Sequence, residues 1–485
     1  MFSNKVQAIV LAAGKSTRFN TGRTKLLEKI CGQEMILYTM RLLEQLNIPI
    51  SVVVGYQKDQ VQHAITRRHF NGVNFIVQEE QCGTGHAIMC TKNVWDREHI
   101  LVMNGDVPLV NSAIIENLYE KHISSHADVS FVTAHNADPN MGGYGRVIRT
   151  ENSIKIVEAR DFDGDANEHC CINAGIYLVR RQFLNNCIQQ LAQNDKTHEF
   201  YITDLIKIAS DQGLTVSTTS APFDRIRGIN TLQELWAAEQ IKRAELIKYW
   251  MEKGVHFSVA QNVHIDLDIA IGAGTYVGCG VHILSGSVIG KNCRLQEFAA
   301  IENTHIGDGC NILPHCIIKD SYIGANSVVG PFAHIREHCQ IAENNNIGNF
   351  VEIKKSVIGK NTKIRHLAYI GDASVGANVN IGAGTITCNY NGLEKNRTII
   401  EDNAFIGSNN TLIAPVTIEQ GAYTAAGSVI SENVPAQALA IARARQVNKE
   451  GYAQQLREPK ILDSQAINSG FMGAIKTKNS ASDAS

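Results

Sequence analysis

The stretch VAQNVHIDLDIAIGAGTYVGCGVHILSGSVIGKNCRLQEFAAI, residues 259–301, places an aliphatic residue at every sixth position. Neither an α-helix nor an ordinary β-strand has a period of six. A hexapeptide β-helix has this period, because each of its short flat sides turns one apolar residue into a triangular prism. The aliphatic series, here called the hexapeptide ladder, begins with Val259, Ile265, Ile271, Val277, Ile283, Ile289, Leu295 and Ile301.

The hexapeptide ladder continues toward the C-terminus after a few five-residue steps. It resumes through Ile323, Val329, Ile335, Ile341, Ile347 and Ile353, reaches Ile381, and returns at Ile400, Ile406, Leu412 and Ile418. The segment TITCNYNGLEKNRTI, residues 385–399, interrupts it. Because insertions in solenoids form loops on one face and often carry function, we expect a functional loop here.

The first part of the chain has a different pattern, in which short apolar strands alternate with amphipathic helices. PISVVVGY, HILVMNGD and NAGIYLV are typical of strands, and EMILYTMRLLEQL is typical of a helix. This alternation predicts a mostly parallel, Rossmann-like α/β sheet with helices on both faces and ligands beyond the carboxyl ends of the strands. Gly14 and Asp106 both stand at such ends.

The segment VQAIVLAAGKSTRF, residues 6–19, contains the tetrapeptide GKST, with which a phosphate-binding P-loop also ends. A P-loop needs a glycine five positions before Gly14, but Ile9 stands there, and the G-x-G-x-x-G spacing of dinucleotide sites is also missing. The small residues Ala12, Ala13 and Gly14 still let the backbone approach a ligand closely. Arg18 and Lys25 add positive charge, so we expect a phosphate site of another design.

The chain divides into four expected regions. Residues 1–229 form the α/β domain, residues 230–256 a linker built on one long helix, and residues 257–462 the β-helix. Residues 463–485 are rich in Ser, Asn, Ala and Gly and are expected to be disordered.

The bulk composition limits the kinds of partner. With 45 basic against 47 acidic residues, nothing favours nucleic acid or an acidic membrane surface, so small molecules are expected. The 12 cysteines show no C-x-x-C pair, which disfavours a disulfide or zinc framework. No apolar run is long enough to span a membrane, and the first one lacks a cleavage pattern. A cytoplasmic protein is therefore expected.

Motifs in both halves resemble one family. They are LAAGKSTRF, QEEQCGTGHA, NGDVPL, GYGRVI, INAGIY and FYITD, followed by IGNFVEIKKSVIG, HLAYIGDASVGANVNIGAGTITCNYNG and AAGSVI. The chain resembles the bacterial bifunctional N-acetylglucosamine-1-phosphate uridylyltransferases and glucosamine-1-phosphate N-acetyltransferases over nearly its whole length. The resemblance implies a left-handed β-helix and synthesis of UDP-N-acetylglucosamine from glucosamine 1-phosphate, with acetyl-CoA and UTP as co-substrates.

The chain departs from the family at three positions. Ser16 stands where glycine is usual, Thr24 where proline is usual, and Asn104 where tyrosine is usual. These differences affect binding of the nucleotide and preference for its base more than the reaction, because the charged residues of the family motifs are present.

For uridylyl transfer, the main tasks are to position the triphosphate and to neutralise its developing charge. Arg18 and Lys25 are the expected clamps, and Asp106 is a suitable oxygen ligand for Mg²⁺, although surface charge and a turn are the alternative interpretations. The resemblance adds Asn230 as a second metal ligand. It also implies contacts to nucleotide and sugar by Ala12, Ala13, Gly14, Gln78, Gly83, Thr84, Gly145, Glu158, Asn173 and Thr203.

For acetyl transfer, an amine must lose a proton and an oxyanion must be stabilised. His366 is the candidate base, because imidazole titrates near neutrality, and Glu352 is expected to orient it. The resemblance implies phosphate binding by Arg336, Lys354 and Lys395. It further implies contacts to sugar and thioester by Tyr369, Asn380, Asn389 and Tyr390, an oxyanion-side donor in Ser408, and coenzyme contacts by Ala383, Ala426 and Arg443.

The resemblance also implies a homotrimer with acetyl-transfer sites between subunits. Two other functions stay open at this point. The β-helix could serve only as an oligomerisation or regulatory module of a nucleotidyltransferase, or the chain could resemble nucleotide-exchange subunits of translation factors. The interrupting segment with Asn389, Tyr390 and Lys395 argues against the first alternative, and Arg18, Lys25 and Asp106 argue against the second.

Overall fold

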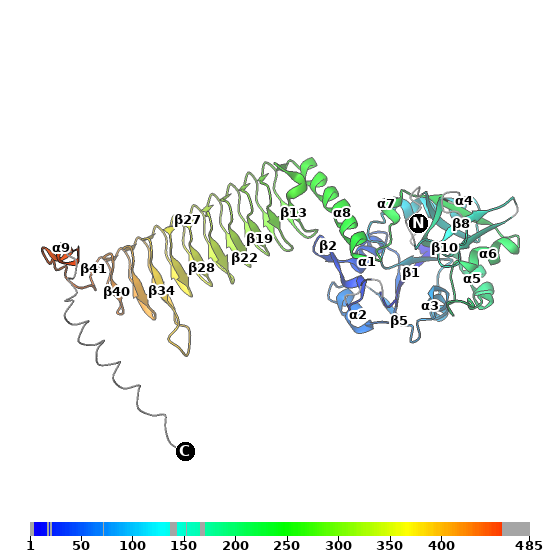
Figure 1. Cartoon of the computed structure of the whole chain (residues 1–485), viewed down its shortest axis with the longest axis horizontal. Helices are drawn as coiled ribbons and strands as arrows, with labels where there is room; N and C mark the ends of the chain where they lie inside the picture. The colour runs from blue at the N-terminus through cyan, green and yellow to red at the C-terminus, as the bar shows by residue number, and fades with distance from the viewer. Residues whose placement is uncertain are drawn as a thin grey trace, which may run out of the picture. The chain divides into compact units, whose positions relative to one another are not determined.

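The computed structural model describes residues 4–16, 19, 22–70, 72–135, 143–151, 153–164 and 170–457. The chain divides into two compact units, Met1–Ala440 and Ile441–Ser485. The first unit holds the α/β region, helix α8 (Leu232–Glu252) and the β-helix (Figure 1). The second holds α9 (Tyr452–Arg457). The expected disorder of residues 463–485 lies outside the described residues.

Nine strands of the described α/β region form one sheet in the order β11-β7-β10-β6-β1-β4-β5, with the hairpin β8–β9 attached to β10. Strands β5, β4, β1 and β6 are mutually parallel, as predicted. Their bounds are β1 (Val6–Ala12), β4 (Ile50–Val54), β5 (Asn74–Val77), β6 (His99–Asn104), β7 (Val129–His135), β8 (Arg146–Arg149), β9 (Ile154–Val157), β10 (Cys171–Arg180) and β11 (Val216–Ser220). A small separate sheet pairs β2 (Lys29–Ile30) with β3 (Gln33–Glu34).

Strand β10, which contains NAGIYLV, runs antiparallel to both of its neighbours, β6 and β7. The sheet is therefore more mixed than the alternation of strands and helices predicts. In the described residues between β7 and β10 the chain makes the hairpin β8–β9 and no crossover helix. A strand reached without a crossover returns antiparallel, which explains the difference.

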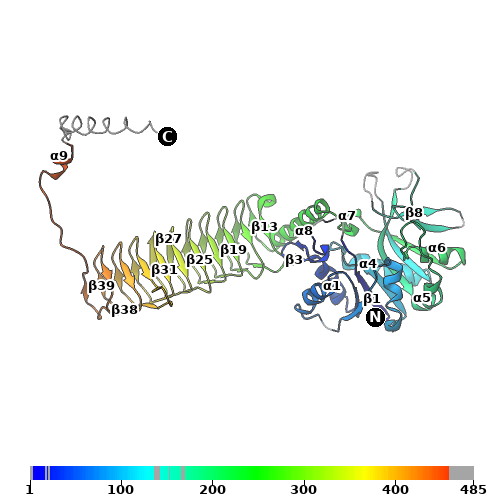
Figure 2. The same cartoon turned by 60° about the horizontal axis from the view of Figure 1, so that its bottom comes forward.

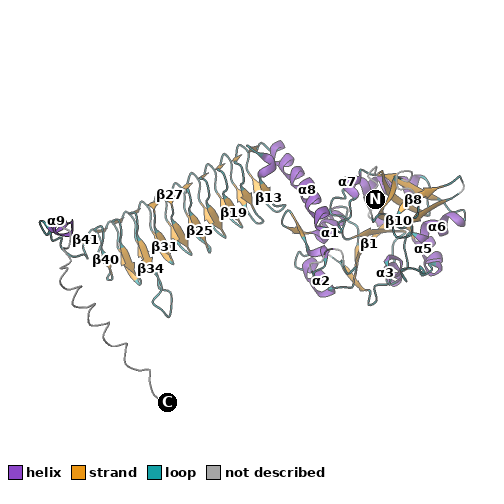
Figure 3. Ribbon diagram, in the orientation of Figure 1, coloured by secondary structure: helices purple, strands orange, loops and turns teal. Residues whose placement is uncertain are grey.

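Helices cover both faces of the large sheet (Figure 3). On β1 and β4, Val10 and Val52 pack with α1, α2 and α4, whereas Ile9 and Val53 pack with α3, α5 and α6. This division follows from the alternation of side chains along a strand. The helices are α1 (Met35–Gln45), α2 (Lys58–Thr66), α3 (Thr84–Met89), α4 (Ser112–Ser124), α5 (Arg181–Cys187), α6 (Asp204–Asp211) and α7 (Phe223–Ile226), with the 3-10 turns η3 (Lys25–Leu27), η4 (Lys92–Val94) and η5 (Ile188–Gln190).

The long helix predicted within residues 230–256 is α8. It starts at a capping box, in which the Thr231 side chain accepts from the Glu234 backbone and the Glu234 carboxylate accepts from the Thr231 backbone. It ends before Gly254, whose φ of 85° suits the left-handed position that follows many helices.

The β-helix consists of three parallel sheets whose short strands stack coil upon coil (Figure 2). The first sheet contains β12 (His256–Phe257), β15 (Tyr276–Val277), β18 (Arg294–Leu295), β21 (Asn311–Ile312), β24 (Val328–Val329), β27 (Asn346–Asn349), β30 (Lys363–His366), β33 (Asn380–Ile381), β36 (Phe405–Ile406), β39 (Tyr423–Thr424) and β41 (Leu439–Ala440). The second contains β13 (His264–Ile265), β16 (His282–Ile283), β19 (Ala300–Glu302), β22 (Ile317–Lys319), β25 (His334–Arg336), β28 (Glu352–Lys354), β31 (Tyr369–Gly371), β34 (Ile386–Cys388), β37 (Thr411–Ile413) and β40 (Val429–Ile430). The third contains β14 (Ala270–Ile271), β17 (Val288–Ile289), β20 (His305–Ile306), β23 (Tyr322–Ile323), β26 (Gln340–Ile341), β29 (Val357–Ile358), β32 (Ala373–Val375), β35 (Thr398–Ile400) and β38 (Val416–Ile418).

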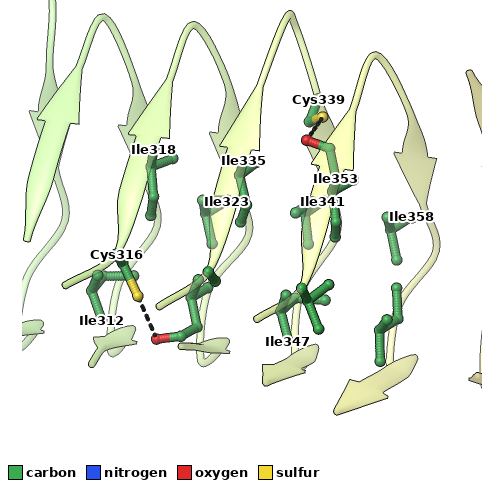
Figure 4. Packing of buried hydrophobic residues seen from close by; sticks show 14 of the residues in the cluster. Ile312, Cys316, Ile318, Ile323, Ile335, Cys339, Ile341, Ile347, Ile353 and Ile358 are labelled. Carbon is green, nitrogen blue, oxygen red and sulfur yellow. Dashed lines mark hydrogen bonds between the residues drawn. The ribbon is translucent and has the colours of Figure 1, made fainter. Parts of the chain in front are cut away.

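The hexapeptide ladder forms the core of this β-helix, and its aliphatic side chains fill the interior (Figure 4). Ile283 lies beside Ile301 in the next coil, and Ile301 lies beside Ile318 in the one after. The five-residue steps in the sequence therefore correspond to coils one residue shorter than three hexapeptides. The predicted fold class, an α/β nucleotidyltransferase-like domain followed by a hexapeptide β-helix of the left-handed kind, is confirmed.

Two details of the hexapeptide ladder differ from the prediction. Val259 is only half-buried and precedes the 3-10 turn η6 (Ala260–Asn262), which displaces the first coil from the six-residue period, so Phe257 fills the core there. The interruption is also shorter than residues 385–399, because β34 and β35 stay in the sheets and Thr387 points inward. The loop itself comprises residues 389–397.

Two buried histidines make the stability of the α/β region depend on pH. His122 Nδ1 lies 2.8 Å from Ser130 Oγ, and its Nε2 lies 3.1 Å from His99 Nδ1. Burial lowers the pKa of His122 to about 3 and also lowers the pKa of His99. In the unfolded chain a histidine has a pKa of about 6.5, so below that pH the unfolded chain binds more protons than the folded chain.

We therefore expect the free energy of unfolding to fall by about 1.4 kcal/mol per pH unit for His122 as the pH drops from about 6.5 toward 3. Denaturant unfolding at several pH values measures this slope. The His122→Gln variant should have a shallower slope, and an unchanged slope in that variant would contradict the assignment.

None of the helices in the described part of the chain combines the length and apolar character needed to cross a membrane.

Two candidate active sites

A cavity of about 990 Å³ opens at the carboxyl ends of β1 and β6. The predicted nucleotide and sugar residues come to it from strands and loops that are far apart in the sequence. Those lining the cavity are Ala12, Ala13, Gly14, Lys25, Gln78, Gly83, Thr84, Asp106, Gly145, Glu158, Asn173 and Asn230. Arg18 lies outside the described residues. A cavity of this size suits a ligand as large as a sugar nucleotide.

Lys25, Asp106 and Asn230 meet at one point of the cavity wall. The Lys25 ammonium donates to Asp106 Oδ2 at 2.5 Å and to Asn230 Oδ1 at 2.7 Å. The other Asp106 oxygen, Oδ1, is buried and has no hydrogen-bond partner among the described residues. Carboxylate and amide oxygens that converge in this way suit a divalent cation, and the unpaired Asp106 Oδ1 is available to bind it. Phosphate oxygens of a bound nucleotide would complete the coordination of the cation.

Gln78 and Gly83 form the end of the cavity predicted to hold the base. Gln78 is buried, and its Nε2 donates to the Gly83 carbonyl at 3.1 Å and lies 3.1 Å from His86 Nδ1. Gly83 has a φ of 95°, and a Cβ there would lie 2.5 Å from the Phe200 carbonyl oxygen. Only glycine therefore lets α3 start this close to the segment around Phe200. The structure places Gln81 here as well, although it was not among the predicted residues.

Glu158, Asn173 and Thr203 belong to the predicted sugar end. Burial raises the pKa of Glu158, and the Thr203 hydroxyl, which donates to Glu158 Oε1 at 2.8 Å, partly opposes that effect. Thr203 is thus connected to the cavity through Glu158. Asn173 Nδ2 donates to the Tyr177 hydroxyl at 2.6 Å, and Tyr177 also lines the cavity.

The second predicted site lies on the β-helix. His366 is exposed at the end of β30, outside the prism, and its Nδ1 is 2.8 Å from Asn349 Oδ1 in the coil before. Since an amide oxygen only accepts, this contact places the proton on Nδ1 and leaves Nε2 free to take a proton. Asn349 was not predicted, although it lies one coil before His366, at a spacing that the hexapeptide ladder defines.

His366 belongs to a row of residues at one corner of the β-helix, two positions after the inward residue of each coil. Adjacent coils pair Ile347 with Ile364, Ile364 with Ile381, Ile381 with Ile406, and Ile406 with Thr424. The row, here called the corner row, is therefore Asn349, His366, Ala383, Ser408 and Ala426. It brings the predicted base, oxyanion donor and two coenzyme contacts into one line.

The predicted phosphate-binding cations gather on the neighbouring side of the β-helix. Arg336 donates to Glu352 Oε1 through Nε at 2.9 Å and Nη2 at 2.6 Å, and Lys354 pairs with Glu337 at 3.4 Å. Lys395 belongs to the loop 389–397, and the nearby Lys354 ammonium lowers its pKa. Glu352 therefore contacts Arg336, and the residue that contacts His366 is Asn349.

The loop 389–397 projects from the β-helix beside β34 (Figure 1). Asn389 Nδ2 donates to Asp372 Oδ2 at 2.5 Å and lies 3.5 Å from the Tyr369 hydroxyl. Tyr390 pairs with Lys395 across the loop as an isolated β-bridge. Asn380 lies in β33, between Lys363 and Phe405 of the adjacent coils. Arg443 belongs to the second compact unit.

Comparison with known proteins gives a consistent family assignment. Residues 8–196 match the family model of the MobA-like NTP transferase domain, and residues 259–344 match that of the GMPPB C-terminal domain. The bifunctional protein GlmU of Geobacillus thermodenitrificans is 41% identical over 94% of this chain and 99% of its own length. That of Caldicellulosiruptor saccharolyticus is likewise 41% identical over 94% and 99%, and that of Clostridioides difficile is 38% identical over 93% and 97%.

NTP transferases use nucleotide substrates and a divalent metal, in agreement with the cavity at Asp106. With relatives at this identity matching along both halves of the chain, the protein belongs to the family of bifunctional GlmU proteins, the transferases that make UDP-N-acetylglucosamine.

Proposed function

We propose that the β-helix of this chain transfers an acetyl group from acetyl-CoA to glucosamine 1-phosphate, and that the α/β domain then transfers uridylyl from UTP to the product with Mg²⁺. The observation that carries this proposal is the presence of two separate groups of reactive residues. One lines the cavity around Lys25, Asp106 and Asn230, and the other follows the corner row of the β-helix around His366.

In the α/β domain, a phosphate oxygen of N-acetylglucosamine 1-phosphate attacks the α-phosphorus of UTP, and pyrophosphate leaves. Mg²⁺, held by Asp106 and Asn230, would neutralise charge on the phosphate oxygens. Lys25 adds a second fixed positive charge at the same point, and Arg18 is proposed to add a third. Gln78 supplies an amide that both donates and accepts, which suits the edge of uracil.

In the β-helix, the amine of glucosamine 1-phosphate attacks the thioester carbon. His366 Nε2 takes the ammonium proton, while the Asn349 oxygen holds the proton on Nδ1 and so fixes the ring. The carbon–sulfur bond then breaks, and the second proton of the attacking nitrogen passes to the sulfur, giving the amide and coenzyme A as the free thiol. Ser408, in the same corner row, is proposed to donate to the oxyanion, and Arg336, Lys354 and Lys395 to bind the sugar phosphate.

The test uses purified chain and separate readouts. With glucosamine 1-phosphate and acetyl-CoA it should release free thiol, and with N-acetylglucosamine 1-phosphate, UTP and Mg²⁺ it should release pyrophosphate. Chelation of the metal should stop only the second reaction. A chain that releases pyrophosphate but never thiol would favour a β-helix without catalytic function.

We also propose a homotrimer in which a second copy covers the apolar residues beside the corner row. Phe298, His315, Phe332 and Phe350 stack at 4.9–5.2 Å between ring centroids, and Leu367 continues the line. Phe298, Phe332, Phe350 and Leu367 are 48–62% exposed in the single chain. Phe350 and Leu367 directly follow Asn349 and His366, so a subunit seated on them would also border the acetyl-transfer residues.

Sedimentation velocity should therefore give about three times the 53.2 kDa mass of one chain. Phe350→Glu should shift the protein toward monomers and reduce thiol release while leaving pyrophosphate release in place. A monomeric wild-type protein with full thiol release would contradict the proposed assembly.

A further inference from the structure

The short turn that carries Lys25 is held by two side chains from other segments. The Lys25 backbone N–H donates to Ser16 Oγ at 3.1 Å, and the Thr24 N–H donates to Gln57 Oε1 at 2.8 Å. Gln57 Nε2 in turn donates to the Gly22 carbonyl at 3.0 Å. These hydrogen bonds fix the backbone on both sides of Thr24, directly before the catalytic cation.

The backbone of this turn needs these partners. Thr24 is fully buried, and as the residue before η3 it has no helical acceptor for its N–H, so Gln57 satisfies a donor that would otherwise be unpaired. Ser16 has a φ of 54°, in the left-handed region that favours glycine. Its hydroxyl offsets this cost by accepting from Lys25.

Gln57 is itself anchored to the edge of the sheet that forms the cavity. It lies in the short connection from β4 to α2 and takes a left-handed conformation at the start of α2. The preceding residue, Tyr56, donates its N–H to the Ala13 carbonyl at 3.2 Å. Gln57 therefore connects the Lys25 turn to the same strand ends that carry Gly14 and Asp106.

The backbone conformations of Ser16 and Thr24 would also suit glycine and proline. Glycine adopts positive φ without cost, and proline fixes φ near −65° and has no N–H to satisfy. Thr24 has a φ of −66°, so a proline backbone fits there. With glycine at position 16 and proline at position 24, the turn would need neither the Ser16 hydroxyl nor the Gln57 amide.

We propose that Ser16 and Gln57 are positioning residues for uridylyl transfer. They hold the Lys25 ammonium beside Asp106 through side-chain hydrogen bonds to the backbone of the turn that carries Lys25. The proposal rests on the uridylyl-transfer function proposed above for this cavity.

The test is Gln57→Leu, with Gln60→Leu, an exposed position on the same helix, as the matched control. Gln57→Leu leaves the buried Thr24 N–H unpaired, and kcat/KM for UTP should fall by about tenfold. The loss should appear mainly in kcat, because Lys25 acts on charge that develops in the transition state. Thiol release from the β-helix of the same preparation reports that the chain is folded, and it should not change.

A second set of variants tests whether the loss comes from the position of Lys25 or from a general loss of stability. In Thr24→Pro there is no N–H to donate to Gln57, so adding Gln57→Leu to Thr24→Pro should change kcat/KM for UTP little. If Gln57→Leu alone fails to fold, the same comparison is made in the Ser16→Gly/Thr24→Pro chain. An equal loss with and without Thr24→Pro, or no loss at all, overturns the proposal. A wild-type chain that releases no pyrophosphate overturns the uridylyl-transfer function itself.

Discussion

Replacement of His366 by alanine should reduce thiol release by about 10²–10⁴-fold, the usual contribution of a positioned general base. The reacting amine carries a proton at neutral pH, and His366 is the imidazole in the corner row whose Nδ1 is held by Asn349. Its Nε2 is then free to accept that proton. Steady-state assays with glucosamine 1-phosphate and acetyl-CoA measure the loss.

The control for His366→Ala is His305→Ala, which removes another exposed histidine of the same β-helix, in β20. That variant should keep its thiol release within about twofold of wild type. Pyrophosphate release from N-acetylglucosamine 1-phosphate should also survive in His366→Ala. Equal losses in the two histidine variants would remove His366 from the acetyl-transfer mechanism.

Replacement of Asp106 by asparagine should lower pyrophosphate release by about 10²–10³-fold and raise the Mg²⁺ concentration needed for half-maximal rate. The substitution keeps the size of the side chain but removes the negative charge that pairs with Lys25 and would bind the metal. It also changes the buried Oδ1, which has no partner among the described residues. Magnesium titration of the reaction with UTP measures both effects.

Asp96→Asn is the matched control, because Asp96 is an exposed aspartate whose ion pair with Arg97 lies on the surface. Its rate and its Mg²⁺ requirement should not change. Thiol release should also persist in Asp106→Asn, since the β-helix carries its own residues for acetyl transfer. An unchanged Mg²⁺ requirement in Asp106→Asn would place the metal elsewhere.

The β-helix could be predicted from the sequence because one inward aliphatic residue per side is a local, repeated requirement. The prediction was wrong at Val259, where a 3-10 turn lengthens the first coil. The direction of β10 was also not predictable, because it depends on the hairpin β8–β9 and not on the pattern of the strand itself.

The cavity of the α/β domain was well predicted, because parallel strands end at one edge and bring Gly14 and Asp106 together. Asn349 and Gln57 were not predicted. Their side chains contact residues that are distant in the sequence, His366 for Asn349 and Thr24 for Gln57, and such contacts depend on the stacking of coils or the path of a turn. No pattern in the residues next to Asn349 or Gln57 predicts these contacts.

The most direct test of two independent sites in one chain is complementation in a mixture. His366→Ala and Asp106→Asn chains are purified separately and supplied with glucosamine 1-phosphate, acetyl-CoA, UTP and Mg²⁺, and UDP-N-acetylglucosamine is measured. Each variant alone should make the product far more slowly than wild type. The mixture should make it much faster than either variant, after a lag, as N-acetylglucosamine 1-phosphate passes from one protein to the other. A mixture as inactive as each variant alone would contradict the account.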